Sequence, residues 1–281
     1  MGRVTTSRMV LRVSPGTTRR EPDTLAGEEP LELRVGGRSL AVTMRTPGAD
    51  FDLAAGFLVS EGVIHGPRDL VAMRYCAGAG DDGGNQYNLL ELTLGEHVAA
   101  PDESVARAFF TTSSCGLCGK ASIDAVRTRS AFEVREDPLR VAPELLTALP
   151  ARLRAAQKVF ETTGGLHAAA LFDGASGELL VLREDVGRHN AVDKVVGWAL
   201  REDRLPLRST ILMVSGRASF ELVQKAVMAG LPMLCAVSAP SSLAADLADE
   251  AGMTLVGFLR DPSFVVYAGE QRVLAPATVA P

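Results

Sequence analysis

The sequence predicts an α/β protein in which helices cover a mixed sheet, with an α+β N-terminal part. From residue 166 onward, short apolar segments typical of buried strands alternate with amphipathic helical segments, which implies βαβ units and a partly parallel sheet. Before residue 100, a hairpin pattern precedes a helical segment and a separate strand pattern. At 281 residues, 47% of them hydrophobic, the chain is long enough to bury a sizeable core.

The first half of the chain predicts two parts. Residues 1–28 hold five arginines before the first acidic residue and no apolar segment, so we expect a flexible N-terminal arm or a first edge strand, rather than a secretory signal. Residues 29–140 are expected to form an N-terminal α+β subdomain that carries a cysteine loop. Its predicted elements are a hairpin (31–35 and 39–44, joined by Gly36-Gly37), a helix from a cap at Asp50 or Asp52 to about Val59, a turn at 77–84, a strand at 87–94 and a short helix after Pro101.

The second half predicts a C-terminal α/β subdomain over residues 141–281. It begins with a helix at 142–158 that Pro150 is expected to interrupt, because proline removes a backbone donor. Cys235 lies in an apolar strand pattern, so we expect a buried core thiol. Strands are predicted at 166–172, 178–182, 210–214, 233–237, 254–259 and 264–267, with helices at 189–201, 219–229 and 241–251.

Composition and charge exclude several function classes. A formal net charge of −5 without a basic block argues against a nucleic-acid surface. No stretch approaches the roughly 20 apolar residues of a membrane span, so no membrane partner is expected. Four cysteines do not make a disulfide framework in a chain of this length. These observations favour a cytoplasmic protein with reduced thiols.

The most informative segment is 111–120, TTSSCGLCGK, in which Cys115 and Cys118 lie three residues apart. Close thiols next to a cation such as Lys120 often include one with a depressed pKa, which makes a nucleophilic thiolate. Spacing alone leaves three interpretations open: half of a zinc site, thioredoxin-like redox exchange, and sulfur carriage as a persulfide. A zinc site would need a second cysteine pair, and a zinc deaminase would need proline where Ser114 stands, so no metal site is expected.

Two small-residue loops follow predicted parallel strands and open helices. One lies at 215–219 and contains Gly216 and Arg217, and the other lies at 238–242. Ligands in open α/β sheets bind at the carboxyl ends of strands, and helix N-termini attract phosphate, so a nucleotide-type ligand is predicted here. Each loop is also compatible with a plain serine cap.

The charged segment 183–194, REDVGRHNAVDK, marks another change from strand to helix. His189 and Asp193 are four residues apart and are therefore expected to share a helix face. The segment predicts either a polar site, with His189 or Arg188 near an anionic ligand, or a capped helix start with surface ion pairs.

Together these motifs resemble the FdhD family of formate dehydrogenase accessory sulfurtransferases. The resemblance covers nearly everything after residue 30, and it is carried by TPGADFDLAAGFLVSEGVI, TTSSCGLCGK, TGGLHAAAL, REDVGRHNAVDKVVG, SGRASFELVQKAVMAGLP and SAPSSLAADLADEAGMTLVGFLR. It implies a second half similar to the cytidine-deaminase fold without its zinc site, and a homodimer.

The same resemblance implies a function. The protein would take persulfide sulfur from a cysteine desulfurase on Cys115, with Cys118 assisting. It would then transfer that sulfur to the molybdenum cofactor, Mo-bis-molybdopterin guanine dinucleotide, destined for formate dehydrogenase. A non-catalytic chaperone for the cofactor and a CxxC thiol oxidoreductase are the alternatives.

The resemblance also implies cofactor-binding residues. The family's cofactor-binding stretch matches Phe258, Leu259, Arg260, Asp261, Pro262 and Ser263. Other members often have glycines after the arginine, where this chain has Asp261-Pro262. The guanine dinucleotide carries phosphates, which suit the guanidinium groups of Arg260 and Arg217.

Overall fold

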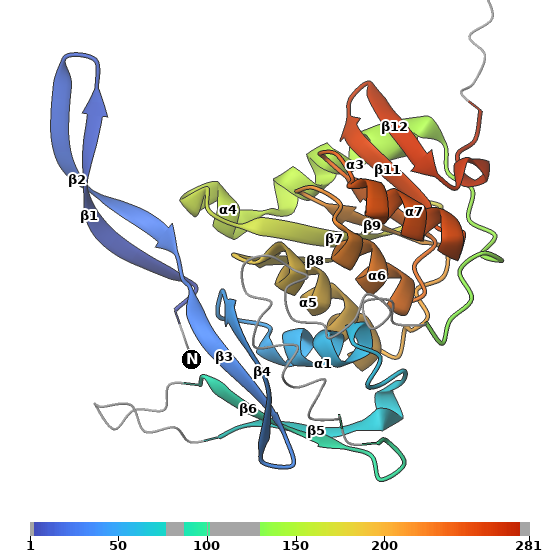
Figure 1. The fold of residues 1–281 in the computed structure, drawn as a ribbon. Helices are drawn as coiled ribbons and strands as arrows, with labels where there is room; N and C mark the ends of the chain where they lie inside the picture. Colours follow the sequence, from blue (N-terminus) through green and yellow to red (C-terminus); the bar gives the residue numbers. More distant parts are fainter. Residues whose placement is uncertain (1–2, 77–86, 100, 102–129, 276–281) are drawn as a thin grey trace, which may run out of the picture.

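A six-stranded mixed sheet forms the central layer of the computed structural model, which describes residues 3–76, 87–99, 101 and 130–275 (Figure 1). The strand order is β12-β11-β10-β9-β7-β8. β9, β10 and β11 run parallel, while β7, β8 and β12 pair antiparallel with their neighbours, so the predicted mixed α/β sheet is confirmed. The strands are β7 (His167–Asp173), β8 (Leu179–Asp185), β9 (Thr210–Val214), β10 (Met233–Ala236), β11 (Thr254–Arg260) and β12 (Ser263–Ala268).

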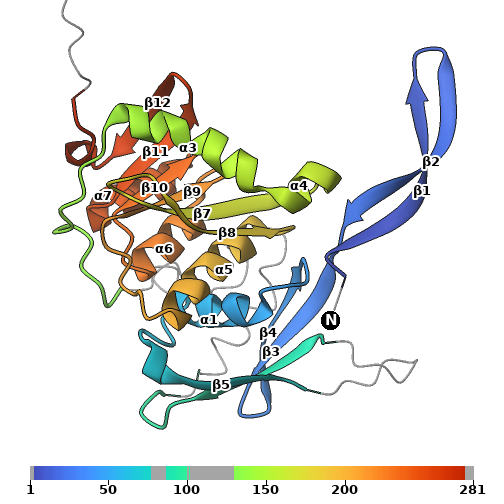
Figure 2. The same ribbon diagram turned by 180° about the vertical axis from the view of Figure 1, so that it is seen from behind.

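Helices cover both faces of this sheet. α5 (Arg188–Arg201), α6 (Phe220–Met228) and α7 (Ser242–Ala251) lie on one face, and α3 (Pro143–Ala156) lies on the other (Figure 2). Successive strand residues face opposite sides, so Leu212 joins the core under α5–α7 whereas Met213 joins the core under α3. Cys235 is fully buried in the second core, as predicted.

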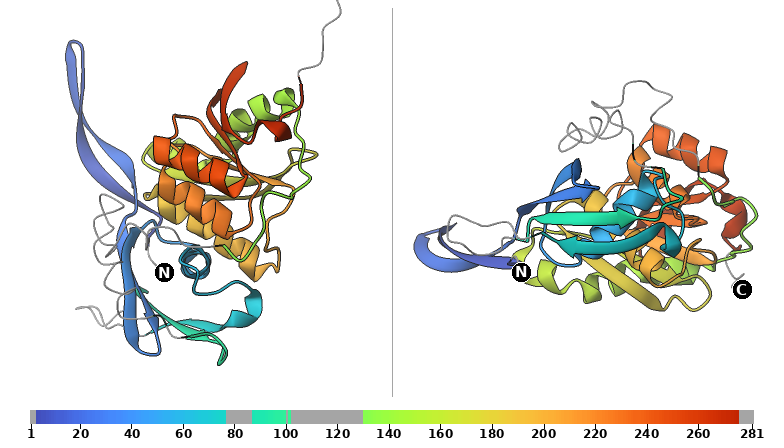
Figure 3. Two further views of the ribbon diagram at one scale, coloured as in Figure 1. Left: turned by 45° about the vertical axis from the view of Figure 1, so that its right-hand side comes forward. Right: turned by 90° about the horizontal axis from the view of Figure 1, so that it is seen from below.

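A smaller four-stranded sheet forms the first half, in the order β4-β3-β6-β5. Between it and the large sheet lies α1 (Asp50–Ser60), which packs against this small sheet and against α5 (Figure 3). One hydrophobic core therefore runs from the small sheet through α1 to the large sheet. The strands are β3 (Glu29–Val35), β4 (Arg38–Arg45), β5 (Leu70–Tyr75) and β6 (Leu89–Leu94), with short turns of 3-10 helix at η1 (Pro67–Asp69) and η3 (Glu270–Arg272).

The junction between α1 and α5 is a contact between two backbones. A Cβ atom added to Gly56 would lie 1.8 Å from the carbonyl oxygen of Asp193, and one added to Gly197 would lie 1.8 Å from that of Asp52. Only glycine permits so close a crossing. The Asp52 carboxylate ion-pairs with Arg183 at 2.7 Å and also with Arg201, which ties the start of α1 to β8 and α5.

Two local expectations are wrong. α3 is not interrupted at Pro150, because the apolar side chains around that position, Leu146, Leu149 and Leu153, are buried and hold the helix together. Neither Asp50 nor Asp52 caps α1, which instead begins after a left-handed Ala49. Both carboxylates are buried in ion pairs with arginines. β5 was not predicted, and α4 (Lys158–Thr163) continues the chain after α3.

Residues 5–26, where a flexible arm or a first edge strand was expected, form a projecting hairpin. β1 (Thr5–Ser14) and β2 (Thr17–Ala26) pair antiparallel over their full length and extend away from the body (Figures 1 and 3). The division at residues 140 and 141 stays a prediction. The predicted turn at 77–84 and the helix after Pro101 lie outside the described residues, as do Cys115 and Cys118. No helix in the described ranges is long and apolar enough to cross a membrane.

Candidate functional site

Three loops meet where β9, β10 and β11 end. The backbone N–H of Ser238 donates to the carbonyl of Gly216 at 3.4 Å, and the N–H of Phe258 donates to the carbonyl of Ser238 at 3.2 Å. Residues 215–219, 238–241 and 257–263 therefore form one continuous rim, which we call the strand-end edge. It contains every residue that the sequence analysis assigned to cofactor binding, with the loop at Ser238 lying between Gly216 and Arg217 on one side and residues 258–263 on the other.

Exposure separates residues 258–263, which run from the end of β11 through the turn to the start of β12. Leu259 is fully buried in the core under α3, so only its backbone can face a ligand. Phe258 is 41% exposed and has a φ of 51°, in the left-handed region that non-glycine residues rarely adopt. The remaining residues of the turn are exposed: Arg260, Asp261, Pro262 and Ser263.

The beginning of β7 adds a histidine to this edge. His167 lies beside Gly216, because a Cβ atom on that glycine would be 3.5 Å from the ring Nδ1. The Oγ of Ser215 accepts a hydrogen bond from the Ala168 N–H at 2.9 Å, which joins the two strand ends. Burial lowers the pKa of His167, and the positive charges of Arg188 and His189 lower it further. Burial and these two cations therefore both favour the neutral form of the His167 ring.

Arg188 has an unused donor. Its Nε is buried and has no hydrogen-bond partner within the part of the chain that the structure describes. The residue begins α5, where the backbone N–H groups of a helix N-terminus also favour an anion.

Asp185 fixes the position of this helix start. Its buried carboxylate accepts hydrogen bonds from the N–H of Thr46 at 3.1 Å, the N–H of Gly187 at 2.8 Å and the Nδ2 of Asn190 at 3.1 Å. It also ion-pairs with the buried Nζ of Lys194 at 2.6 Å. The charged segment 183–194 thus contains buried pairs rather than only the surface ion pairs that one interpretation expected.

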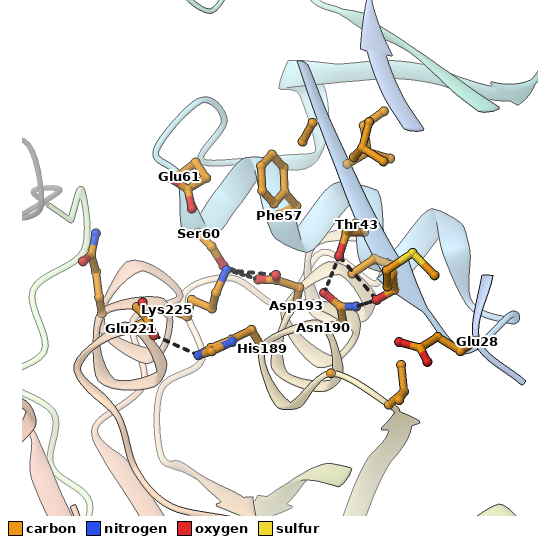
Figure 4. A pocket seen from close by; sticks show the side chains of 18 residues that line it. Glu28, Thr43, Phe57, Ser60, Glu61, His189, Asn190, Asp193, Glu221 and Lys225 are labelled. Atoms are coloured by element: carbon orange, nitrogen blue, oxygen red, sulfur yellow. Dashed lines mark hydrogen bonds and ion pairs between the residues drawn. The ribbon is translucent and has the colours of Figure 1, made fainter. Parts of the chain in front are cut away.

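A cavity of about 310 Å³ lies next to the strand-end edge, between β4, α1, α5 and α6 (Figure 4). His189 and Asp193 both line it, so the predicted shared helix face is confirmed. Asp193 accepts a hydrogen bond from Ser60 at 2.6 Å and pairs with Lys225 at 2.9 Å, while His189 pairs with Glu221 at 2.9 Å.

The charges inside the cavity stabilise one another. Burial disfavours the charged Lys225, but Asp193, Glu61 and Glu221 outweigh it and raise the pKa of this lysine. The hydrogen bond from His189 lowers the pKa of Glu221 against the effect of its burial. Aliphatic and aromatic side chains form the other walls: Leu33, Ala41, Val42, Met44, Leu53 and Phe57.

Sequence reasoning missed the contribution of the first half to this site. Ser60 and Thr43 reach the cavity from α1 and β4, and no motif marked either position. The spacing of acid and lysine also gave no signal that Asp193 would pair with Lys225, 32 residues away. Among the described residues, no group of three or more His, Cys, Asp or Glu side chains could hold a metal ion.

Comparison with known proteins places this chain in a family. The model of the FdhD/NarQ family matches residues 26–274. The chain belongs to the FdhD/NarQ family. The match includes the strand-end edge, the cavity and the cysteine pair, and it confirms the resemblance found from the motifs.

Curated relatives of this family are similar over almost the whole chain. The chain is 61% identical over 281 residues to the sulfur carrier protein FdhD of Streptomyces avermitilis. The aligned region covers 100% of this chain and 99% of the relative. It is 59% identical over 270 residues to the protein of the same name from Mycolicibacterium paratuberculosis, covering 96% and 99%.

A solved structure shares the fold. It is described as a candidate formate dehydrogenase accessory protein from Desulfotalea psychrophila, and it superposes with a TM-score of 0.77 at 21% identity. The match covers 97% of this chain and 100% of that one.

Proposed function

We propose that this protein is a sulfur carrier that serves formate dehydrogenase. It takes sulfur from a cysteine desulfurase and transfers it, in the cytoplasm, to the molybdenum cofactor Mo-bis-molybdopterin guanine dinucleotide, which is its substrate and cargo. The observation that carries the proposal is the near full-length identity of about 60% to proteins named as sulfur carriers. The cysteine pair and the strand-end edge supply the two chemistries that such a carrier needs.

The sulfur-carrying step is assigned to Cys115. Its thiolate attacks the outer sulfur of a persulfide on the desulfurase, the sulfur–sulfur bond of the donor breaks, and the donor cysteine leaves as a thiolate. Cys115 then holds the transferred sulfur as its own persulfide. Attack by the Cys118 thiolate on the Cys115 sulfur would release that sulfur to the acceptor and form a disulfide, which a dithiol reductant returns to two thiols.

The cargo-binding role is assigned to the strand-end edge. Arg217 and Arg260 are exposed there, and guanidinium groups match the geometry of phosphate oxygens. The unused Nε of Arg188 supports the binding of an anion at this edge. The dinucleotide ends of the cargo are the anions that this assignment expects.

Mass spectrometry after incubation with a cysteine desulfurase and cysteine tests the carrier role. We expect the peptide that contains Cys115 to gain one sulfur atom, which a reductant removes. Cys115→Ser should abolish the gain, whereas Cys118→Ser should keep the gain but slow delivery to the cofactor.

Two results would favour the alternatives. If neither cysteine gains sulfur while the desulfurase turns over, the protein is a chaperone that only holds the cofactor. If the pair cycles between dithiol and disulfide and both cysteines are required equally, the protein is a thiol oxidoreductase.

A further inference from the structure

The hairpin of β11 and β12, at one side of the large sheet, carries two exposed aromatic side chains beside the strand-end edge (Figure 1). Phe258 and Tyr267 are 41% and 40% exposed. A Cβ atom added to Gly257 would lie 2.9 Å from the ring of Tyr267 and 2.8 Å from Pro240, so the ring lies directly against the strand backbone. An exposed ring held in this way offers a flat apolar surface on which a base can stack.

A bulge in β11 turns Arg260 to the same side of the sheet as this ring. In a regular strand Leu259 would share a face with Gly257. The register shifts between Gly257 and Arg260, however, and Leu259 is buried with Val256 in the core under α3. Arg260 follows on the opposite face, which is the face where Gly257 and Tyr267 lie.

The tip of the hairpin carries a carboxylate. Asp261 and Pro262 form the two-residue connection between β11 and β12, and both are exposed. The Asp261 carboxylate has no hydrogen bond or ion pair with any other residue that the structure describes. Members of the family that the sequence resembles often have glycine after the arginine, so a carboxylate here is a choice made by this chain.

A carboxylate is complementary to one edge of guanine. Guanine presents two donors side by side on its Watson–Crick edge, the N1–H and the N2 amino group. A carboxylate is an acceptor only, and its two oxygens match two such donors. Adenine presents an acceptor at N1, which would face the carboxylate oxygens without a proton between them. Asp261 would therefore distinguish guanine from adenine.

We propose that Asp261 selects the guanine base of the cargo by accepting hydrogen bonds from the N1–H and the N2 amino group, while the base stacks on Tyr267 and Phe258. Arg260 is adjacent in the chain and has a much longer side chain, so it can engage the phosphate end of the same nucleotide. The inference rests on the proposed cargo-binding role of the strand-end edge and adds the residue that reads the base.

Calorimetric titration of the full-length protein with four diphosphates, those of guanosine, inosine, xanthosine and adenosine, tests the assignment. Inosine lacks the N2 amino group, and xanthosine has a carbonyl oxygen in its place. Wild type should bind guanosine diphosphate at least about tenfold more tightly than inosine diphosphate, the loss expected for one charged hydrogen bond. Adenosine and xanthosine diphosphates should bind more weakly still, because each places an acceptor against the carboxylate.

Asp261→Asn should change the preference rather than only weaken binding. The new amide donates to the xanthine O2 and accepts from N1–H, so this variant should bind xanthosine diphosphate more tightly than guanosine diphosphate. Asp249→Asn is the matched control, an exposed aspartate near the end of α7 that lies far from the edge, and it should keep the wild-type order.

Tyr267→Leu separates stacking from base selection. It should weaken the binding of guanosine and inosine diphosphates by the same factor, about fivefold, and leave the ratio of the two affinities unchanged. Neither Asp261 nor Tyr267 belongs to a hydrophobic core, so both variants should keep the thermal stability of the wild type.

The possible failures are distinguishable. If wild type binds guanosine diphosphate and Arg260→Ala weakens that binding, but Asp261→Asn leaves the order of the four nucleotides unchanged, then Asp261 does not read the base and the cargo-binding role of the edge stands. If wild type binds none of the four, the cargo-binding role is wrong and the assignment of Asp261 fails with it.

Discussion

Charged side chains are paired with one another at the α1–α5 junction, whereas at the strand-end edge they are exposed or keep an unused donor. α5 contributes to both regions. At the junction, Asp52 is paired with two arginines and Asp193 is paired with Lys225 and bonded to Ser60. At the edge, Arg188 keeps a donor with no partner among the described residues. Arg217 and Arg260 are exposed to solvent there.

The difference indicates what each region does. Paired, buried charges hold two halves of the protein in one arrangement, and removing one partner leaves the other uncompensated. Exposed or unsatisfied positive groups at strand ends and helix starts are available to an anionic ligand. Changes at the junction should therefore alter stability, and changes at the edge should alter binding.

The largest effect is expected from Gly197→Val. The new side chain would meet the backbone of Asp52 at the crossing of α1 and α5, so the helices must separate. We expect a loss of about 3 kcal/mol or more in the free energy of unfolding, measured by urea denaturation. Gly66→Ala is the control, because a Cβ atom there meets nothing within 4 Å, and it should change little. A stable Gly197→Val protein would show that the junction is not a close contact.

A similar or smaller loss is expected from Asp193→Asn. The substitution keeps the shape of the side chain but removes the carboxylate that pairs with the buried Lys225. Breaking one side of such a pair should cost about 3 kcal/mol in the free energy of unfolding. Adding Lys225→Met to this variant should recover part of the loss. If the double variant is less stable than the single one, the lysine does not depend on that pair.

The pH dependence of His167 gives a finer test of the edge. Burial and the neighbouring cations lower its pKa in the folded protein, so the unfolded chain binds the proton more tightly. The free energy of unfolding should therefore increase as the pH rises towards about 6.5, and it should decrease as the pH falls below that value. His167→Gln should remove this slope.

NMR titration of the His167 ring detects ligand binding directly. We expect an apparent pKa below 6.5 for the free protein, and guanosine diphosphate should raise it because bound phosphate offsets the charges of Arg188 and His189. A titration curve that the nucleotide does not shift would place the anion site elsewhere.

Much of the large sheet could be predicted from the sequence. β9 was predicted at its observed bounds, because TILMV is an apolar run between turn signals. The βα loops were also placed correctly, since small residues after a strand commonly open a helix. The loops were expected to lie close together, because the carboxyl ends of parallel strands meet at one edge of a sheet.

Other features depend on contacts between residues that are distant in the chain. Asp52 was expected to cap a helix, but its partners Arg183 and Arg201 come from β8 and α5. α3 continues through Pro150 because burial outweighs the missing backbone hydrogen bond. The cavity could not be predicted either, because Ser60 and Lys225 meet there only after the two halves pack together.

Calorimetric titration with guanosine diphosphate tests most directly the claim that the strand-end edge binds the cargo. Arg260→Ala should weaken binding by about tenfold, the loss expected for one charged hydrogen bond to phosphate. The matched control is Arg208→Ala, an exposed arginine just before β9, at the opposite end of that strand from Gly216 and Arg217. The account predicts wild-type affinity for the control. Equal affinities for wild type and Arg260→Ala would contradict it.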